Sequence, residues 1–497
     1  MTPDSRTWRP ALWVGSFAAA VLFALAAPAA AATITLTQVS SDPYTNTSSQ
    51  HATEVEPDTF ANGSTVIAAF QVGRFFNGGA TNIGFARSGD GGTTWSHGFL
   101  TGLTATSGTG GRTGAPFERV SDPSVAFDAR HGVWLISSIP LLPSRVVPVV
   151  FVSRSTNGGA RWSAPVSIPQ PPVPHVNLDK NWTACDNTPT SPFYGNCYTE
   201  FDNFAENDLE YMSTSSDGGR TWSVPVSPAG NPRGLGGQPV VAPNGTVVVP
   251  FETINGNISA FRSTDGGQSW SQAATVSRIA FHPVAGNLRT SPLPTAEVDG
   301  AGNVYVAWED CRFRAGCSSN DIVFSRSADG ATWPAVFRVP IDDVTTTVDH
   351  FIPGLGVDRA TAGAGAHLAL TYYYYPDAAC TAATCQLDVG FISSPNGGAN
   401  WGTATQLAGP MSLADIADTS QGPMVGDYIS TSFASTGTAS TVFAVGKPHT
   451  AAFDEAMYSP GPLSVASASA ATLVASSDRV LTPATGQGLG AAVIHRE

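Results

Sequence analysis

Short apolar runs separated by polar, glycine-rich segments cover most of the chain. The runs are rich in β-branched and aromatic residues, as in Thr65-Val-Ile-Ala-Ala-Phe70 and Val304-Tyr-Val-Ala-Trp308. Runs of this length and composition, bounded by turn residues, are typical of β-strands. The pattern therefore predicts an all-β protein with many tight turns.

One of the polar segments recurs six times with the pattern Ser-x-Asp/Asn-Gly-Gly-x-x-Trp, once shortened by a residue. The copies are Ser88–Trp95, Ser155–Trp162, Ser215–Trp222, Ser263–Trp270, Ser327–Trp333 and Ser394–Trp401. A motif that returns at a roughly constant period indicates a repeat architecture. An apolar run precedes most copies, so a strand is expected to lead into each turn.

Each residue of the motif has a structural role in this interpretation. The glycines can adopt positive φ, the Asp or Asn accepts hydrogen bonds from turn N–H groups, and the Trp returns as an apolar anchor. We therefore expect these acids to stabilise turns and not to act in catalysis.

The motif resembles the Asp box, also called the BNR repeat, best known from sialidases. The resemblance implies a β-propeller of four-stranded blades. Seven inner-strand openings, against six Asp boxes, favour seven blades, with one opening belonging to a loop insertion. The ring would be closed by the N-terminal strand 33–39, which would complete the last unit. Six blades, with the last unit as an accessory sheet, is the alternative.

The chain ends suggest the domain limits. Arg6, Arg9, the apolar stretch Ala11–Ala27 and the small residues after it predict a cleaved signal peptide over 1–32, with an uncleaved anchor as the alternative. The propeller would span 33–463, and the Ala- and Ser-rich segment 464–497 would be a loosely packed tail. We expect a secreted protein with no membrane contact after cleavage.

The net charge excludes some classes of binding partner, and the cysteine spacing indicates how the cysteines are paired. A net charge of −14, with only 24 Lys and Arg residues, argues against nucleic acid and anionic membranes. Carbohydrate is the partner that the resemblance implies, and we expect a monomer. The spacing of the six cysteines favours three local disulfides, Cys185–Cys197, Cys311–Cys317 and Cys380–Cys385, over the alternative of a zinc site. No metal or cofactor is expected.

Candidate site residues lie where inner strands of a propeller would begin, because loops of several blades converge there. Substrate-binding candidates are Asp179, Lys180, Trp182, Asp310, Arg312, His350, Asp427 and Arg74. Lys180 is one of only two lysines in the chain. Structural ion pairs are the competing interpretation of the groups around Asp179–Lys180 and Glu309–Arg312.

The resemblance also implies catalytic roles. Sialidases use a Tyr nucleophile activated by Glu, an Asp acid and three arginines that hold the substrate carboxylate. Here Tyr428 matches the nucleophile, Glu309 its activator and Asp122 the acid, with Arg74, Arg289 and Arg312 as candidate arginines. The chain would then be a sialidase-like glycoside hydrolase acting on a terminal sugar.

A second class of function is also open. The Arg-Ile-Pro that sialidases carry near the first inner strand has no match, and Glu56-Pro57-Asp58 stands in a similar place. This departure and the excess of acidic over basic residues favour a non-catalytic BNR-repeat propeller that binds glycan or protein at the cell surface. A lyase, or another enzyme acting on polysaccharides, is a further alternative.

Overall fold

The computed structural model describes residues 1–2, 7, 34–107, 117–450, 452–467, 471–472 and 475–476. Met1–Ile34 and Thr35–Glu497 form two separate compact units, and all the described strands lie in the second. The predicted signal peptide lies outside the described residues apart from positions 1, 2 and 7. Among the described residues, no helix has the length and apolar character needed to cross a membrane.

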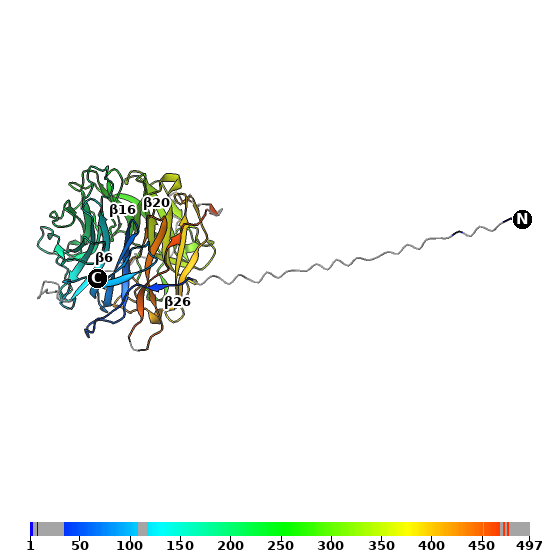
Figure 1. The fold of residues 1–497 in the computed structure, drawn as a ribbon, viewed down its shortest axis with the longest axis horizontal. Coiled ribbons are helices and arrows are strands. Elements are labelled where there is room, and N and C mark those ends of the chain that lie inside the picture. The colour runs from blue at the N-terminus through cyan, green and yellow to red at the C-terminus, as the bar shows by residue number, and fades with distance from the viewer. Residues whose placement is uncertain are drawn as a thin grey trace. The chain divides into compact units, whose positions relative to one another are not determined.

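The second unit is built from β-strands, as Figure 1 shows, which confirms the predicted all-β class. The only helical elements in the described residues are short 3-10 turns. They are η1 (Phe204–Glu206), η2 (Ala285–Asn287), η3 (Ala315–Cys317), η4 (Gly363–Gly365) and η5 (Leu413–Asp415). All paired strands run antiparallel, as expected where successive strands are joined by short turns.

Successive segments of the chain form successive sheets. The first eight strands after the N-terminal one are β2 (Glu54–Asn62), β3 (Thr65–Arg74), β4 (Ala80–Ser88), β5 (Ser96–Phe99), β6 (Arg119–Asp128), β7 (Val133–Leu141), β8 (Phe151–Ser155) and β9 (Val166–Ser167). Strands β2–β5 and β6–β9 form two meanders linked by one residue pair, Ala80 with Val120.

The middle of the chain continues this arrangement. One sheet contains β10 (Leu178–Cys185), β11 (Cys197–Asn203) and β12 (Leu209–Ser215). The next contains β13 (Gly234–Leu235), β14 (Val240–Val241), β15 (Val247–Thr253), β16 (Asn257–Ser263) and β17 (Ala274–Arg278). A third contains β18 (Thr295–Val298), β19 (Val304–Asp310), β20 (Asp321–Ser327), β21 (Val336–Arg338) and β32 (Ala475–Ser476).

The last sheets bring the two ends of the unit together. One contains β22 (Asp349–Val357), β23 (Leu368–Tyr375), β24 (Gln386–Ser394) and β26 (Thr405–Ser412), and β25 (Asn400–Trp401) pairs with β31 (Ala471–Thr472). The final sheet contains β27 (Ser430–Phe433), β28 (Thr438–Gly446), β29 (Glu455–Ser459) and β30 (Leu463–Ser464), with β1 (Thr37–Gln38) along β29.

The first strands of successive sheets contact one another. Strand β2 contacts β6, β6 contacts β10, β14 contacts both β10 and β18, and β22 contacts β18 and β27. Strand β27 in turn contacts β2. Buried apolar side chains fill the spaces between neighbouring sheets, for example Leu135 and Val152 with Phe201. This all-β arrangement fits a β-propeller.

The Asp boxes have the predicted turn geometry. In the first copy, the Gly92 and Thr94 N–H groups donate to Ser88 Oγ and Asp90 Oδ1, both at 2.8 Å. The Trp95 indole N–H donates to the Gly92 carbonyl at 3.0 Å. The hydrogen bonds from the Thr94 hydroxyl and backbone lower the pKa of Asp90 to about 2. The acid therefore serves the turn.

The three predicted disulfides are present: Cys185–Cys197, Cys311–Cys317 and Cys380–Cys385. Each closes a short loop, of 12, 6 and 5 residues respectively. In the predicted tail 464–497, two short pieces pair with outer strands, and most of the remainder lies outside the described residues.

Candidate functional site

Four of the first strands carry a bulge near their beginnings. The strand register shifts between Val55 and Asp58 in β2, and equivalent shifts occur in β6, β10 and β22. The residue inside each bulge has positive φ: 61° at Glu56, 49° at Asp122, 50° at Lys180 and 48° at Ile352. Non-glycine residues rarely adopt this conformation, which costs on the order of 1–3 kcal/mol each. A bulge redirects a side chain, and here three of the four are charged.

Lys180 is the centre of the resulting cluster. Its side chain is 1 % exposed, and its Nζ binds Asp427 Oδ2 and lies 3.6 Å from Glu56 Oε1 and 3.9 Å from Asp122 Oδ1. Burial alone lowers the pKa of Lys180, but the charges of Asp122, Asp427, Glu56 and Asp179 outweigh it and raise that pKa well above its usual value. The ammonium group therefore stays charged.

A second cation reaches the same acid. Arg289, in the segment between β17 and β18, donates from Nε to Asp427 Oδ1 at 2.7 Å and from Nη2 to Asp427 Oδ2 at 2.5 Å. Arg289 is itself 1 % exposed, and its backbone N–H donates to the Pro423 carbonyl. The two-fold hydrogen bond between a guanidinium and a carboxylate is the strongest ionic geometry available to these side chains.

A chain of amide and hydroxyl groups extends the cluster to Arg74. The Gln71 amide donates to Glu56 Oε2 and, at 2.9 Å, to Ser121 Oγ, which in turn donates to Asp122. Arg74 Nη1 donates to Gln71 Oε1 at 2.8 Å. Gln71 is absent from the candidates predicted from the sequence, although it is the one polar side chain inside the apolar run of β3.

Two aromatic residues border the cluster. The rings of Trp182 and Tyr428 meet edge to face with centroids 4.9 Å apart, and both residues are half-buried. The Tyr428 hydroxyl donates to the Pro123 carbonyl at 3.1 Å. Burial, followed by the charges of Glu56, Asp122, Asp58 and Asp427, raises the pKa of Tyr428 well above its usual value. The phenol is therefore protonated at neutral pH.

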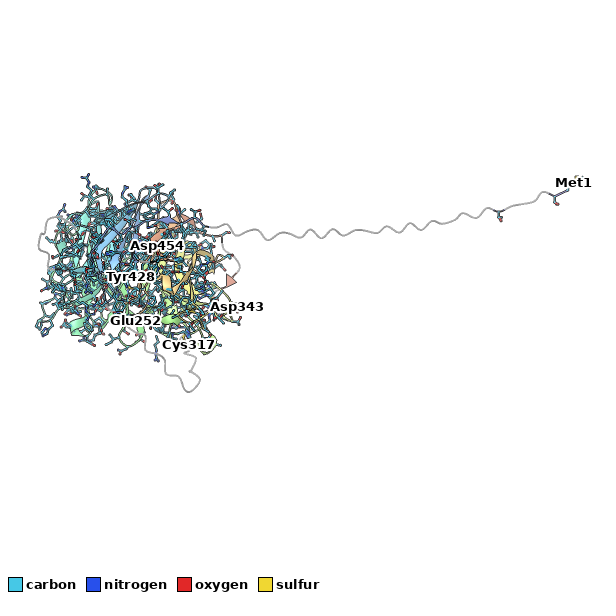
Figure 2. All side chains as sticks on the ribbon, turned by 90° about the horizontal axis from the view of Figure 1, so that it is seen from below. Met1, Glu252, Cys317, Asp343, Tyr428 and Asp454 are labelled. Carbon is cyan, nitrogen blue, oxygen red and sulfur yellow. A yellow bond between two sulfur atoms is a disulfide. The ribbon has the colours of Figure 1, made fainter. Side chains whose placement is uncertain are left out.

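These residues line a small cavity, with Tyr428 labelled in Figure 2. Its wall includes Lys180, Trp182, Gln238, Asp427 and Tyr428, and its volume is about 20 Å³. A cavity of this size holds a single water molecule. Of the predicted site residues, the structure brings together Asp122, Asp179, Lys180, Trp182, Asp427 and Tyr428, with Arg74 joined through Gln71.

Glu309 lies in a different environment. It is buried on β19, and its Oε2 accepts the Ile352 N–H at 2.8 Å. Burial raises the pKa of Glu309 well above its usual value, and Asp349 and Glu252 raise it further. The charges of Glu56 and Asp122 act on the Tyr428 hydroxyl, so these two acids are further candidates for the activator.

Asp310 and Arg312 pair with each other next to the Cys311–Cys317 disulfide. Arg312 donates to Asp310 Oδ1 at 2.9 Å and to Oδ2 at 2.8 Å, and the Trp308 indole donates to Oδ2 at 3.1 Å. Neither residue lines the small cavity. This geometry agrees with the structural ion pair considered for these residues.

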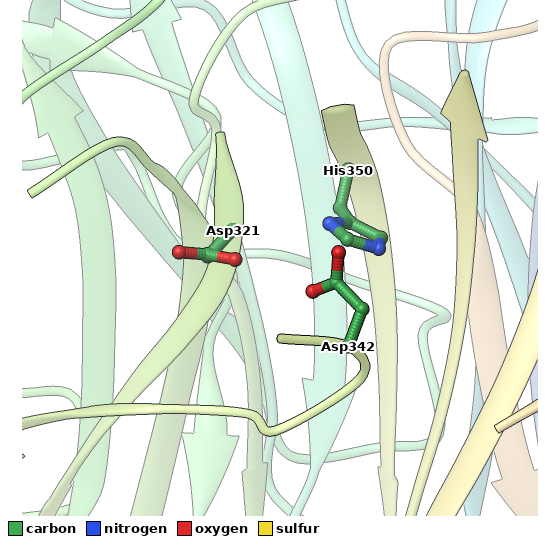
Figure 3. Close-up of side chains that lie close together, drawn as sticks. All are labelled: Asp321, Asp342 and His350. Atoms are coloured by element: carbon green, nitrogen blue, oxygen red, sulfur yellow. The ribbon is translucent and has the colours of Figure 1, made fainter. Parts of the chain in front are cut away.

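His350 lies beside Asp321 and Asp342, and the three side chains have ligand-type atoms within 4.8 Å of one another (Figure 3). Arg314 and Arg338 both bind the two acids, at 2.5 to 2.8 Å. Burial lowers the pKa of His350 to about 4, so the imidazole is neutral. Because the two guanidinium groups already compensate both carboxylates, we assign no metal to this cluster.

Comparison with known proteins supports the fold. Residues 147–351, which contain four of the six Asp boxes, match the family model described as a BNR repeat-like domain. No curated protein matches the chain. This match bears out the BNR-repeat fold predicted from the Asp boxes.

Solved structures resemble this one at low identity. A protein of unknown function from Dyadobacter fermentans is 17% identical, over 72% of this chain and 99% of that chain, with a TM-score of 0.45. A Hadza microbial sialidase is 17% identical, over 72% and 68% of the two chains, with a TM-score of 0.42. A Trypanosoma rangeli sialidase in complex with the inhibitor DANA is 11% identical, over 82% and 55%, with a TM-score of 0.43.

Proposed function

For a chain that contains a BNR repeat-like domain over residues 147–351, we propose a non-catalytic, carbohydrate-binding role, with the ligand held at the Trp182–Tyr428 border of the Lys180 cluster. Half-buried aromatic rings beside amide side chains such as Gln238 suit a sugar ring, which presents apolar C–H groups on its faces and hydroxyl groups around its edge.

One observation carries this proposal. Lys180 and Arg289 both bind Asp427, so the cations that would grip an anionic substrate are already occupied. The carboxylates of Glu56 and Asp122, which act on the Tyr428 phenol, lie 3.6 and 3.9 Å from the Lys180 Nζ. The adjoining cavity of about 20 Å³ leaves no room for a sugar beneath the aromatic pair. A ligand would therefore bind over the rings.

A glycoside hydrolase is the second candidate, because several carboxylates surround the Tyr428 phenol. In that reaction the Tyr428 oxygen would attack the anomeric carbon while its proton passes to a neighbouring carboxylate. Asp122 would protonate the leaving oxygen. The resemblance assigns the activating role to Glu309, whose Oε2 accepts the Ile352 N–H in this structure.

A fluorogenic glycoside panel that includes sialosides, run beside a glycan array, separates the two candidates. We expect no turnover and binding of at least one glycan that is lost in Trp182→Ala, while the matched variant Tyr194→Phe keeps it. Turnover that disappears in both Tyr428→Phe and Asp122→Asn would establish the hydrolase instead. A folded chain that shows neither activity nor binding would overturn both.

We propose further that the propeller has seven blades, with β1 completing the last one. Support comes from the pairing of Thr37 and Gln38 with Ser459 and Tyr458, and from the contact of β27 with β2. Removal of residues 35–40 should then lower the melting temperature of the whole domain. A chain that keeps its melting temperature without them would favour six blades and an accessory sheet.

The remaining proposals concern export and assembly. We propose that a signal peptide over 1–32 is cleaved, that 33–463 is the propeller and that the mature chain is a secreted monomer. Three disulfides are compatible with an oxidising compartment. N-terminal sequencing of the exported chain and its mass in solution test these statements.

A further inference from the structure

A larger cavity lies at the far ends of the same inner strands. The small cavity is lined by Thr295 at the start of β18, Pro353 within β22 and Ile429 just before β27, and the larger one by residues further along these strands. Its volume is about 370 Å³, within the usual range for small-ligand sites. Residues from five sheets converge on it, which is typical of binding sites built on a rigid scaffold.

Glu297 and Arg359 are the charged pair in its wall. Their side chains are 20 % and 36 % exposed, and Arg359 Nη2 lies 3.5 Å from Glu297 Oε2. Charge-assisted hydrogen bonds are normally 2.7–2.9 Å long, so this pair is loose. The Glu297 carboxylate also accepts the Val298 N–H but has further lone pairs, and the Arg359 guanidinium uses only one of its N–H groups in this contact. Both groups therefore keep hydrogen-bonding capacity for a ligand.

Apolar and amide groups complete the wall. Phe60 and Phe433 are half-buried, and the Arg359 guanidinium lies 5.9 Å from the Phe60 ring centre. Asn62 is exposed at the rim. The phenyl rings offer an apolar surface to a ligand. The acid, the guanidinium and the amide beside them can hydrogen-bond to its hydroxyl groups.

One side of the cavity is fixed by the loop that the Cys185–Cys197 disulfide closes. Asn187 in this loop donates to the Phe127 carbonyl and accepts from the Ala129 N–H, both at 2.8 Å. These bonds tie the loop to the neighbouring sheet. A wall held in place in this way loses little conformational entropy when a ligand binds.

The charged residues in the cavity wall indicate which class of ligand can bind there. Glu297 and Asp358 contribute two carboxylates and Arg359 one cation. The excess of negative charge disfavours phosphates and acidic sugars. We propose that this cavity, which we call the distal cavity, binds a neutral saccharide of one or two rings, with Glu297 and Arg359 holding its hydroxyl groups. This site is separate from the Trp182–Tyr428 site and does not depend on the function proposed for it.

Saturation-transfer NMR on the mature chain tests the proposal, with methyl glycosides of glucose, galactose, mannose and N-acetylglucosamine and their neutral disaccharides as probes. We expect transfer to at least one probe, and calorimetry should show binding at least tenfold weaker in Arg359→Ala and in Glu297→Gln. The matched variant Arg161→Ala, at an exposed position outside both cavities, should bind like the original chain.

Variants at the other site keep the two sites distinguishable. Trp182→Ala and Tyr428→Phe should leave binding to the distal cavity unchanged. No transfer to any neutral probe from a folded chain would overturn the proposal, as would binding that survives both Arg359→Ala and Glu297→Gln. Binding lost only in Trp182→Ala would assign the sugar to the other site.

Discussion

Arg289 holds Asp427 with two parallel hydrogen bonds, of 2.7 and 2.5 Å, although 138 residues separate them in the chain. Lys180, on β10, binds the same carboxylate. A fully buried acid is tolerable only with such compensation, because an isolated charge in the interior is strongly unfavourable. The ionic contacts around Asp427 therefore hold the beginnings of several sheets together.

Loss of the Lys180 charge should destabilise the domain. In Lys180→Met, Asp427, Glu56 and Asp122 would lose their shared cation, and the free energy of unfolding should fall by about 3–5 kcal/mol. Urea unfolding measures this change. The other lysine gives the control, because Lys447 is only half-buried and Lys447→Met should cost about 1 kcal/mol or less. Equal effects of the two substitutions would contradict the role given to Lys180.

The buried carboxyl group of Glu252 should make the stability of the domain depend on pH. Burial raises the pKa of Glu252 to about 7, and the Ser291 hydroxyl, which donates to it at 3.0 Å, offsets only part of the shift. Because the folded chain binds this proton more tightly than the unfolded chain, the stabilisation is complete below about pH 4 and is lost as the pH rises to about 7.

Glu252→Gln removes that proton equilibrium. The difference in unfolding free energy between the variant and the original chain should change by about 3 kcal/mol between pH 4 and pH 7.5, with the variant gaining relative stability at the higher pH. Urea titrations at four pH values provide the measurement. Glu118→Gln, at a partly exposed position, should show no such change, and a flat difference for Glu252→Gln would refute the assignment.

The Asp boxes should matter for stability and not for binding. Asp217 accepts the Arg220 and Thr221 N–H groups at 2.9 and 3.0 Å and the Thr221 hydroxyl at 2.6 Å. Asp217→Ala should therefore lower the unfolding free energy by about 1–2 kcal/mol. Thermal unfolding and a glycan-binding assay are run together, and loss of binding at an unchanged melting temperature would reverse the interpretation.

The Cys185–Cys197 disulfide should support both stability and the distal cavity. Closing a loop of 12 residues stabilises a fold by about 3 kcal/mol in the chain-entropy model. The double variant Cys185→Ser/Cys197→Ser should lose about this much and should bind neutral sugars more weakly, because Asn187 lies in the loop. Unreduced tryptic peptides analysed by mass spectrometry confirm the bond; free thiols in the exported chain would exclude it.

Local features were predictable from the sequence because their partners lie close in the chain. In the first Asp box, the bonds that shape the turn join residues at most four positions apart, and each disulfide joins cysteines at most 12 residues apart. The strands themselves follow from β-branched and aromatic runs between turns. The repeat therefore indicated the all-β class without any knowledge of long-range contacts.

The site was only partly predictable, because it depends on contacts between distant strands. The bulges that turn Asp122 and Lys180 inward leave no clear mark in the sequence. Only the family resemblance links Glu309 to Tyr428, and in the structure Glu309, on β19, accepts the Ile352 N–H. The register of the paired strands and the position of each strand in its sheet determine which side chains meet. A single sequence does not show either of them.

The pairing of β1 with β29 also constrains the order in which the chain can fold. Val39 donates to the Met457 carbonyl at 2.8 Å, and the Met457 N–H donates to Ser40 Oγ at 2.9 Å, across 417 residues. During synthesis the first strand must wait until residues Tyr458 and Ser459 have been made before its partner exists. Contacts of such long sequence separation form late and slowly, so closure of this last sheet is expected to be a late step in folding.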